Sequence, residues 1–250
     1  MDKKVVEVLD VSLYAGDIAL FLEEELTKNK HQANNLVSAT GAHGLVYAQK
    51  NPSFKQILQS FYINLPDGMP AVWVGRLKGA KAMRRCYGPD FFKEAMIASA
   101  NTGHTHFLCG GMDGVADRLK QVCQKKFGAK IVGTYCPPFL PVEEFDYAYI
   151  GKQINESKPD FVWIGLSTPK QEQFATRLSK HTKVSYICTV GAAFDFHIGN
   201  VKQAPSWIQK IGMEWFFRLL MEPKRLWKRY VEIVPLFIWY NLKEFISRSS

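Results

Sequence analysis

The sequence predicts an α/β protein with a Rossmann-like, mainly parallel sheet and helices on both of its faces. Short β-branched and apolar runs alternate with longer segments of helical pattern, which is typical of a parallel sheet with crossover helices. Turns that contain glycine or an acidic residue follow several of these runs directly, where parallel sheets bind ligands. The expected strands span residues 36–40, 62–65, 106–109, 130–134, 161–165 and 184–190.

A shift in composition divides the chain into two parts. The α/β pattern stops near Gly199, so we expect a Rossmann-like domain over residues 1–199 and a helical C-terminal appendage over residues 200–250. The appendage holds four of the six tryptophans and supplies +5 of the formal net charge of +9. A local basic region favours an anionic partner, and composition does not choose among phospholipid headgroups, a phosphorylated ligand and nucleic acid.

Other features of the composition limit the setting of the protein. The start of the chain lacks the apolar core of a signal peptide, so we expect a cytoplasmic location. The longest uncharged apolar stretch near the C-terminus, residues 233–242, is far shorter than the roughly 18–20 residues of a spanning helix. Five cysteines without a C-x-x-C pair predict reduced thiols, and the histidine and aspartate spacings predict no metal site.

The appendage has an amphipathic pattern that admits two interpretations. On a helix at about 100° per residue, an apolar stripe lies beside a stripe of arginines. The stripes would suit a membrane interface, with the guanidinium groups at phosphate depth, or a helical pair packed on its own domain. Pro223 is expected to begin a second helix and to interrupt the pattern. The apolar stripe comprises Trp215, Leu219, Leu226, Tyr230, Ile233 and Phe237, and the basic one Arg218, Arg225 and Arg229.

An acidic turn follows the second expected strand. The sequence Pro66-Asp67-Gly68-Met69-Pro70 puts the Asp67 carboxylate at a strand's carboxyl end, from which it could reach a substrate. Asp-Gly turns are also common for conformational reasons alone.

Glycine turns follow later strands. Gly110-Gly111-Met112-Asp113 leads into a helix that should run to about Lys126, and such a turn can bind a phosphate or simply reverse the chain. It lacks the full G-x-G-x-x-G spacing.

The turns at Gly165 and Gly191 repeat this arrangement. After Gly165, Thr168 is a candidate helix N-cap, which places Gln171 in the first turn of the next helix, facing the cleft. The segment does not extend to G-x-S-x-G, which disfavours a serine hydrolase. After Gly191, Asp195 is a candidate for a ribose hydroxyl or for a capping role.

Taken in order, the motifs resemble those of the WecG/TagA/CpsF glycosyltransferase family. The resemblance covers about residues 36–230, and the ordered set is specific although each piece alone is not. The set comprises Thr40, Asp67-Gly68-Met69, Arg85 with Gly88-Pro89-Asp90, Gly110-Gly111, Pro169-Lys170-Gln171-Glu172, Phe194-Asp195-Phe196 with Gly199, Ala204-Pro205, Glu214-Trp215 and Glu222-Pro223-Lys224-Arg225.

The resemblance implies an activity and its partners. Members are bacterial, metal-independent, inverting enzymes that use no cofactor. They move a sugar, often of the N-acetylmannosamine type, from a UDP-sugar onto a polyprenyl-diphosphate-linked sugar in cell-surface polysaccharide synthesis. A peripheral position on the inner face of the cell membrane is expected, with contact through the appendage. A homo-oligomer is compatible with the sequence, which does not fix the oligomeric state.

The resemblance also assigns roles by motif. Asp67 is expected to be the general base, with Thr40, Arg85 and Gln171 around the transferred sugar and diphosphate. The nucleotide would lie along the glycine turns, and the appendage cations would face the lipid diphosphate. The nucleotide set is Gly110, Gly111, Asp113, Gly165, Gly191 and Asp195, and the cationic set is Arg218, Arg225, Lys228 and Arg229.

One departure from the family pattern bears on the donor sugar. Many members have Thr-x-Asn where this chain has Thr40-Gly41-Ala42-His43. The Asn amide is therefore missing, and the identity of the sugar stays open, because hydrogen bonds to particular substituents set such preferences.

Two other classes of function compete with this interpretation. A nicotinamide-dependent oxidoreductase would explain the alternating pattern and Gly110-Gly111 but would leave the appendage without a role. A nucleic-acid-binding module would use the basic tail alone. We favour the glycosyltransferase, without a nucleic-acid partner, and the resemblance provides nearly all of the discrimination.

Overall fold

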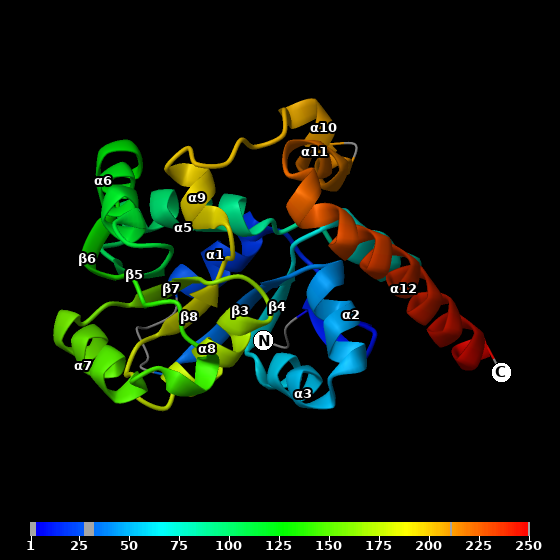
Figure 1. Cartoon of the computed structure of the whole chain (residues 1–250), viewed down its shortest axis with the longest axis horizontal. Coiled ribbons are helices and arrows are strands. Elements are labelled where there is room, and N and C mark those ends of the chain that lie inside the picture. Colours follow the sequence, from blue (N-terminus) through cyan, green and yellow to red (C-terminus); the bar gives the residue numbers. More distant parts are fainter. Residues whose placement is uncertain (1–3, 28–32, 211, 250) are drawn as a thin grey trace.

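The computed structural model describes residues 4–27, 33–210 and 212–249 and shows an eight-stranded, mainly parallel sheet with helices on both faces (Figure 1). The strand order is β1-β2-β4-β3-β8-β7-β5-β6. All six predicted strands are confirmed. They are β3 (Asn35–Thr40), β4 (Ile63–Pro66), β5 (Thr105–Gly110), β6 (Lys130–Tyr135), β7 (Phe161–Gly165) and β8 (Tyr186–Thr189).

Two further strands form a hairpin at one edge of the sheet. The strands β1 (Val5–Val8) and β2 (Val11–Tyr14) pair antiparallel, and β2 continues the sheet by pairing parallel to β4. The hairpin turns at Leu9 and Asp10, which both have positive φ. This hairpin was not predicted from the sequence, because neither turn residue is the glycine or asparagine that usually marks such a turn.

Helices cover the two faces of the sheet in separate sets (Figure 1). One face carries α1 (Ile18–Leu26), α5 (Gly88–Ala100), α6 (Val115–Phe127) and the short α9 (Ala193–His197). The other face carries α2 (Ala42–Lys50), α3 (Pro52–Ser60), α4 (Met69–Leu77), η1 (Val142–Glu144), α7 (Tyr147–Ser157) and α8 (Lys170–Leu178).

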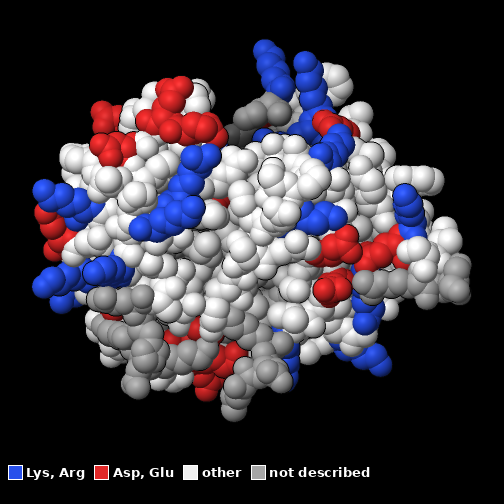
Figure 2. Space-filling view, turned by 90° about the horizontal axis from the view of Figure 1, so that it is seen from below, with Lys and Arg blue, Asp and Glu red and all other residues white. Residues whose placement is uncertain are grey.

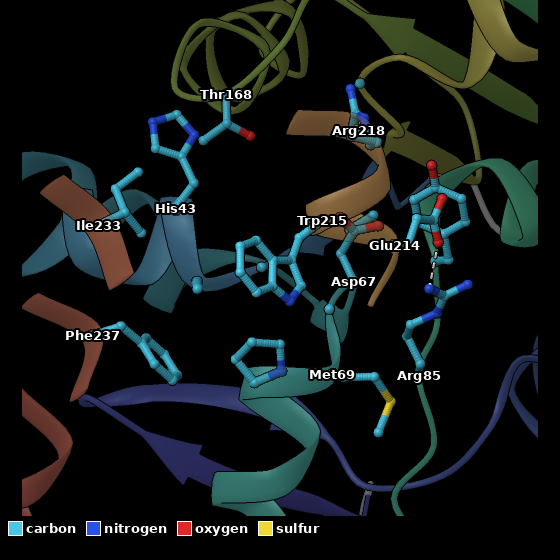
Figure 3. Close-up of a pocket in the computed structure, with 18 of the residues that line it drawn as sticks. His43, Asp67, Met69, Arg85, Thr168, Glu214, Trp215, Arg218, Ile233 and Phe237 are labelled. Atoms are coloured by element: carbon cyan, nitrogen blue, oxygen red, sulfur yellow. Dashed lines mark hydrogen bonds and ion pairs between the residues drawn. The ribbon is translucent and has the colours of Figure 1, made fainter. Parts of the chain in front are cut away.

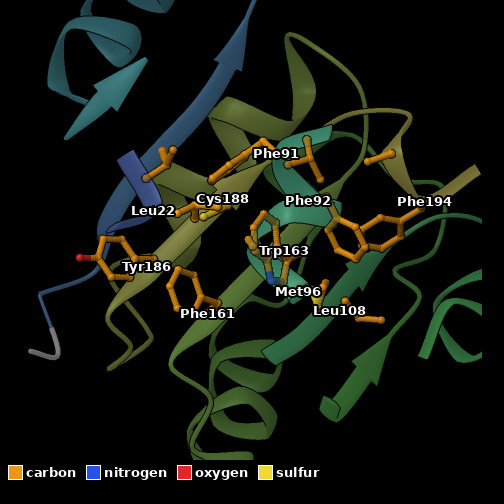
Figure 4. Close-up of a cluster of buried hydrophobic side chains, with 14 of the residues drawn as sticks. Leu22, Phe91, Phe92, Met96, Leu108, Phe161, Trp163, Tyr186, Cys188 and Phe194 are labelled. Carbon is orange, nitrogen blue, oxygen red and sulfur yellow. The ribbon is translucent and has the colours of Figure 1, made fainter. Parts of the chain in front are cut away.

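The strands are apolar on both sides because both faces are covered. In β7, Phe161 and Trp163 belong to one core cluster, whereas Val162 and Ile164 belong to the cluster on the opposite face. Figure 4 shows Trp163 at the centre of the first cluster. Its ring meets that of Phe92 edge-on, with 5.0 Å between the ring centroids.

Neighbouring strand ends diverge near the middle of the sheet. The helix α2 follows β3 on one face, whereas α9 follows the adjacent β8 on the other face. Connections that leave in opposite directions open a crevice at the carboxyl edge of a parallel sheet. The turns that hold Asp67, Gly165 and Gly191 all lie at this edge.

The appendage consists of α10 (Ser206–Lys210), α11 (Glu214–Met221) and the long α12 (Pro223–Ser249). Pro223 begins α12, as predicted. The expected apolar stripe does not face outward, because Leu226, Ile233 and Phe237 are buried. Ile233 and Phe237 join a core cluster with residues of β1, β2, α2, α3 and α4. For this stripe, the structure supports the interpretation of helices packed on their own domain.

Other apolar residues of the appendage are exposed. In its far half, α12 stays attached to the α/β domain, because Glu244 pairs with Lys78 at 2.6 Å and Phe245 packs against a core cluster. On the face shown in Figure 2, Lys and Arg side chains lie in small separate groups, several of them next to Asp and Glu side chains. Within the described residues, none of the helices combines the length and apolarity needed to cross a membrane. The exposed large apolar residues of the appendage include Trp207, Phe216, Leu220, Trp227, Trp239 and Ile246.

The backbones of β5 and β7 approach each other closely at Gly110, and this contact generates a stability prediction. A Cβ atom at Gly110 would lie 2.7 Å from the backbone nitrogen and oxygen of Gly165, at a φ of +149°. We therefore expect Gly110→Ala to lower the free energy of unfolding by about 2 kcal/mol more than Gly103→Ala does. Gly103 also has positive φ, but open space surrounds its Cβ position. Urea denaturation of both variants measures the difference, and equal losses would contradict the steric argument.

Candidate active site

A cavity of about 760 Å³ opens at the carboxyl edge of the sheet (Figure 3). The turns after β3, β4, β7 and β8 form one part of its wall, and residues of α4, α11 and α12 form another. Residues of α2 and the segment from Arg85 to Pro89 also contribute. The predicted site residues that line it are Asp67, Arg85, Gly165, Gln171, Gly191, Asp195, Arg218 and Arg229. The appendage therefore forms part of the same cavity as the strand-end turns.

Asp67 is a half-buried carboxylate directly after β4. Its backbone N–H donates to the Thr40 carbonyl at 3.1 Å, and its Oδ1 accepts from the Gly88 N–H at 2.6 Å. Burial raises the Asp67 pKa to about 6, although the Gly88 hydrogen bond and the Arg85 charge oppose the shift. A carboxylate with this pKa is ionised at neutral pH and is a stronger base than an ordinary aspartate, as general base catalysis requires.

Arg85 joins the α/β domain to the appendage. One guanidinium nitrogen donates to Glu214 Oε2 at 2.6 Å, and the other contacts Gln209 at 3.2 Å and Asp90 at 3.5 Å. The guanidinium also lies 4.6 Å from the ring centroid of Tyr87. Arg85 and Glu214 are both largely buried, so loss of either partner would leave a charge without compensation. An anionic ligand at Arg85 would have to share this cation with Glu214.

Gln171 is fixed at the first turn of α8, where the sequence placed it. Its Oε1 accepts from the Gly191 N–H at 2.9 Å, and its Nε2 donates to Glu172 at 2.9 Å and to Thr168 at 3.3 Å. The predicted N-cap at Thr168 is wrong. The N-cap position is Pro169, and the Thr168 hydroxyl donates instead to the Glu172 carboxyl at 2.9 Å.

Glu172 connects this turn to β3. The same Oε1 that accepts from Thr168 also lies 3.4 Å from the Ser38 hydroxyl, which is 2.6 Å from the Thr40 hydroxyl. Burial raises the Glu172 pKa. Thr40 is itself buried and is not a wall residue of the cavity, so its hydroxyl supports the neighbouring polar groups. No local pattern predicted the Glu172 network, because its members come from segments that are far apart in the chain.

The glycine turns predicted to bind a nucleotide divide into two groups. Gly165, Gly191 and Asp195 line the cavity, whereas Gly110, Gly111 and Asp113 lie outside its wall. The Gly111 N–H donates to the Gly165 carbonyl at 3.1 Å, which gives the glycine pair a packing role. Asp195 Oδ1 accepts from the Asn200 amide at 3.0 Å.

The predicted cations of the appendage also differ in position. Arg218 and Arg229 line the cavity, and the Arg218 guanidinium lies 5.4 Å from the ring centroid of Phe196. Lys228 is exposed and lies outside the wall. The side chain of Arg225 is outside the described residues.

Sequence reasoning assigned no role to several wall residues. His43 is the second residue of α2 and faces the cavity. Burial together with the Arg229 charge lowers its pKa to about 4, so the ring is neutral at pH 7. Trp215 projects into the cavity (Figure 3). Glu214 and Trp215 were part of the ordered motif set, and Trp215 also belonged to the apolar stripe, but neither had been assigned a role in the site. Among the described residues, no group of three or more His, Cys, Asp or Glu side chains is placed to hold a metal ion.

Comparison with known proteins identifies relatives that match most of the chain. The model of the "Glycosyl transferase WecG/TagA/CpsF family" matches residues 6–250. A protein of Bacillus subtilis (strain 168), named N-acetylglucosaminyldiphosphoundecaprenol N-acetyl-beta-D-mannosaminyltransferase, is 32% identical over 198 residues, 79% of this chain and 75% of the relative. A Bacillus spizizenii protein of the same name is 30% identical over 197 residues, 78% of this chain and 74% of the relative.

The raised pKa of Asp67 predicts that the carboxylate destabilises the fold at neutral pH. The pKa of about 6 exceeds the ordinary value of 3.8, so folding favours the protonated form. The contribution of the Asp67 carboxyl to the free energy of unfolding is fully present below about pH 4 and is lost as the pH rises through 6. Asp67→Asn keeps an acceptor for Gly88 and should stabilise the protein at pH 7.5 by on the order of 1–2 kcal/mol, with no gain near pH 4.

Thermal and urea unfolding at both pH values measure this effect. Glu156→Gln on the exposed surface of α7 is the matched control and should change stability little at either pH. A destabilised Asp67→Asn protein at pH 7.5 would show that the carboxylate is well solvated or stabilised by its neighbours.

Proposed function

The chain belongs to the WecG/TagA/CpsF glycosyltransferase family, and we propose that it moves a sugar from a UDP-sugar onto a polyprenyl-diphosphate-linked sugar with inversion and without a metal ion. The observation that carries the proposal is the half-buried Asp67 with a raised pKa, in a cavity that also contains Arg85, Gln171 and Arg218. The names of the two Bacillus relatives support a sugar on undecaprenyl diphosphate as acceptor. The reaction would serve cell-surface polysaccharide synthesis.

The proposed chemistry needs one base and one stabilised leaving group. Asp67 takes the proton of the acceptor hydroxyl while that oxygen bonds to the anomeric carbon, and the bond from this carbon to the UDP oxygen breaks. The leaving diphosphate keeps the electron pair of that bond. Arg218 and Arg85 supply positive charge at the cavity wall, and Arg85 would do so while it remains close to Glu214.

The remaining wall residues fit the donor. We assign the nucleotide to the turns at Gly165, Gly191 and Asp195, because these line the cavity beside Gln171. Hydrogen bonds with Gly191 and Glu172 fix the Gln171 amide, which holds it ready to contact the sugar. For the sugar we propose the N-acetylmannosamine type or a related hexose. The neutral His43 next to Ala42 is the polar side chain at the place where many relatives have Asn.

The alternative of a nicotinamide-dependent oxidoreductase rested on the alternating pattern and on Gly110-Gly111. That pair lies outside the cavity wall and packs on Gly165, so it gives no support to a dinucleotide at this site.

We further propose that the appendage places the enzyme on the inner face of the bacterial cell membrane. Trp227 and Trp239 are exposed on α12, and so is Lys228, the residue after Trp227. Exposed indole rings beside cations suit the interface between headgroups and acyl chains. The buried stripe of Leu226, Ile233 and Phe237 meanwhile attaches α12 to the α/β domain.

Replacement of the proposed base should separate binding from catalysis. Asp67→Asn should retain thermal stabilisation by UDP, with or without EDTA, and should lose about 10²–10⁴ in transfer rate. The assay measures UDP release with a UDP-N-acetylhexosamine panel and a polyprenyl-diphosphate-linked acceptor. Glu156→Gln on α7 is the control and should transfer normally. Wild-type turnover by Asp67→Asn would remove Asp67 from the mechanism, and a UDP shift that EDTA abolishes would contradict metal independence.

The membrane proposal predicts a role for the exposed indoles. The double variant Trp227→Ala, Trp239→Ala should bind vesicles of anionic phospholipid at least about tenfold more weakly, because it loses two interfacial anchors. Its thermal stabilisation by UDP should be unchanged. Tyr149→Ala removes an exposed aromatic residue from α7 at the opposite end of the molecule and serves as the control (Figure 1). Co-sedimentation equal to that of the wild type would show that these residues do not contact lipid.

A further inference from the structure

One face of α12 extends the cavity away from the catalytic groups. The α12 residues that line the cavity recur at spacings of three and four, which places them on a single helical face. From Tyr230 to Phe245 this face is about 22 Å long at 1.5 Å per residue. Its members are Tyr230, Ile233, Val234, Phe237, Ile238, Asn241, Leu242 and Phe245.

The helix α4 forms the opposite wall of this extension. Met69, Trp73, Val74 and Leu77 line the same cavity from α4. Beyond Tyr230, Asn241 is the one polar residue among the described wall residues of the two helices. Its amide donates to the Phe237 carbonyl at 2.7 Å and so serves the helix itself. We name the space between these two helical faces the α4–α12 groove.

The groove is unsuited to a sugar or a nucleotide, and it is partly open. Its walls offer apolar surface with few partners for hydroxyl or phosphate groups, which would lose their hydrogen bonds to water there. Leu77 is 75% exposed, and Ile238 and Leu242 are 54% and 53% exposed. Contiguous exposed apolar surface is typical of a groove that binds an apolar ligand.

Cations lie where the groove meets the polar part of the cavity. Arg218 and Arg229 line the wall there together with Trp215 and Tyr230. The Arg218 Nε is buried and has no hydrogen-bond partner among the described residues, although one terminal nitrogen of the same side chain lies 3.9 Å from Glu222. Figure 3 shows Trp215 with Arg218, Asp67 and Arg85 to one side and Ile233 and Phe237 to the other.

We propose that the α4–α12 groove binds the first isoprene units of the acceptor's polyprenyl chain, with the acceptor diphosphate at Arg218 and Arg229. The inference rests on the proposed function and adds a specific site to it. The groove is continuous with the cavity of Asp67, so its occupant must be joined to a group that enters that cavity. Of the two proposed substrates, only the acceptor carries an apolar chain. In the acceptor, the diphosphate lies between the polyprenyl chain and the sugar. In the protein, Arg218 and Arg229 lie between the groove and Asp67, so the order of the groups is the same.

The proposal predicts that the enzyme distinguishes acceptors by chain length without any membrane. Two detergent-solubilised acceptors carry the same diphosphate and sugar, one with a long polyprenyl chain and one with a chain of two isoprene units. We expect wild-type kcat/KM to be at least about tenfold higher for the long chain, because added isoprene units bury apolar surface in the groove. Ile238→Gln with Leu242→Gln should bring this ratio close to one, because it should lower kcat/KM for the long chain far more than for the short chain, while the UDP thermal shift stays unchanged.

Two further variants separate groove occupancy from a general effect of mutating α12. Val234→Trp fills the groove instead of making it polar, and it should also abolish the preference for the long chain. Val231→Gln changes an exposed α12 residue outside the cavity wall and should keep the wild-type ratio. Melting temperatures and UDP shifts verify that each variant is folded.

The outcomes separate this inference from the proposed function. If the wild type transfers sugar equally well to both chains, or if both groove variants retain the preference, the groove does not bind the polyprenyl chain, whereas the proposed activity stands. If the wild type glycosylates neither acceptor with any UDP-sugar of the panel, the proposed function fails, and the inference fails with it.

Discussion

The parallel pairing of β4, β3, β8 and β7 is the constraint on which the candidate site depends. Parallel strands place all their carboxyl ends at one edge, so turns that are far apart in the sequence become neighbours there. The register puts Pro66 beside Thr40 and puts Thr189 beside Ile164. Asp67, Gln171 and Gly191 thereby reach one cavity. Burial by these same turns and by the appendage raises the pKa of Asp67.

The ion pair between Arg85 and Glu214 makes the appendage part of the site. A buried charge pair contributes little net stability, because desolvation offsets the attraction, but it fixes the relative position of its two partners. Here it holds the start of α11 against the segment that precedes α5, while Ile233 and Phe237 hold α12 against α2. Arg218 and Trp215 face Asp67 as a result, and a ligand that engages Arg85 would act on this attachment.

The cavity has two chemically different ends that suit an amphipathic substrate. One end carries the carboxylate of Asp67, the amide of Gln171 and the guanidinium groups, and the other is the apolar α4–α12 groove. A sugar on a lipid diphosphate has the same order of groups. The exposed Trp227 and Trp239 lie on the helix that forms one wall of this groove, so membrane attachment and acceptor binding would involve the same element.

The sequence alone determined the features that depend on residues close together in the chain. Alternating apolar runs specified the six parallel strands, Pro223 specified the start of α12, and the ordered motifs specified the family. The hairpin of β1 and β2 lacked a recognisable turn, because Leu9 and Asp10 adopt positive φ without glycine.

Tertiary structure decided which distant residues contact each other, and the periodicity of a sequence does not specify this. A helical pattern identifies an apolar face but not what covers it, so Leu226, Ile233 and Phe237 could have met lipid or protein, and burial against the α/β domain decided for protein. Arg85 and Glu214 are 129 residues apart and meet only in the fold. Gly110 and Gly111 match a phosphate-binding turn in sequence, yet both lie outside the cavity wall, and Gly110 packs closely against Gly165 of β7. In each case the deciding interaction joins residues that no local pattern connects, because desolvation and steric contact act across space.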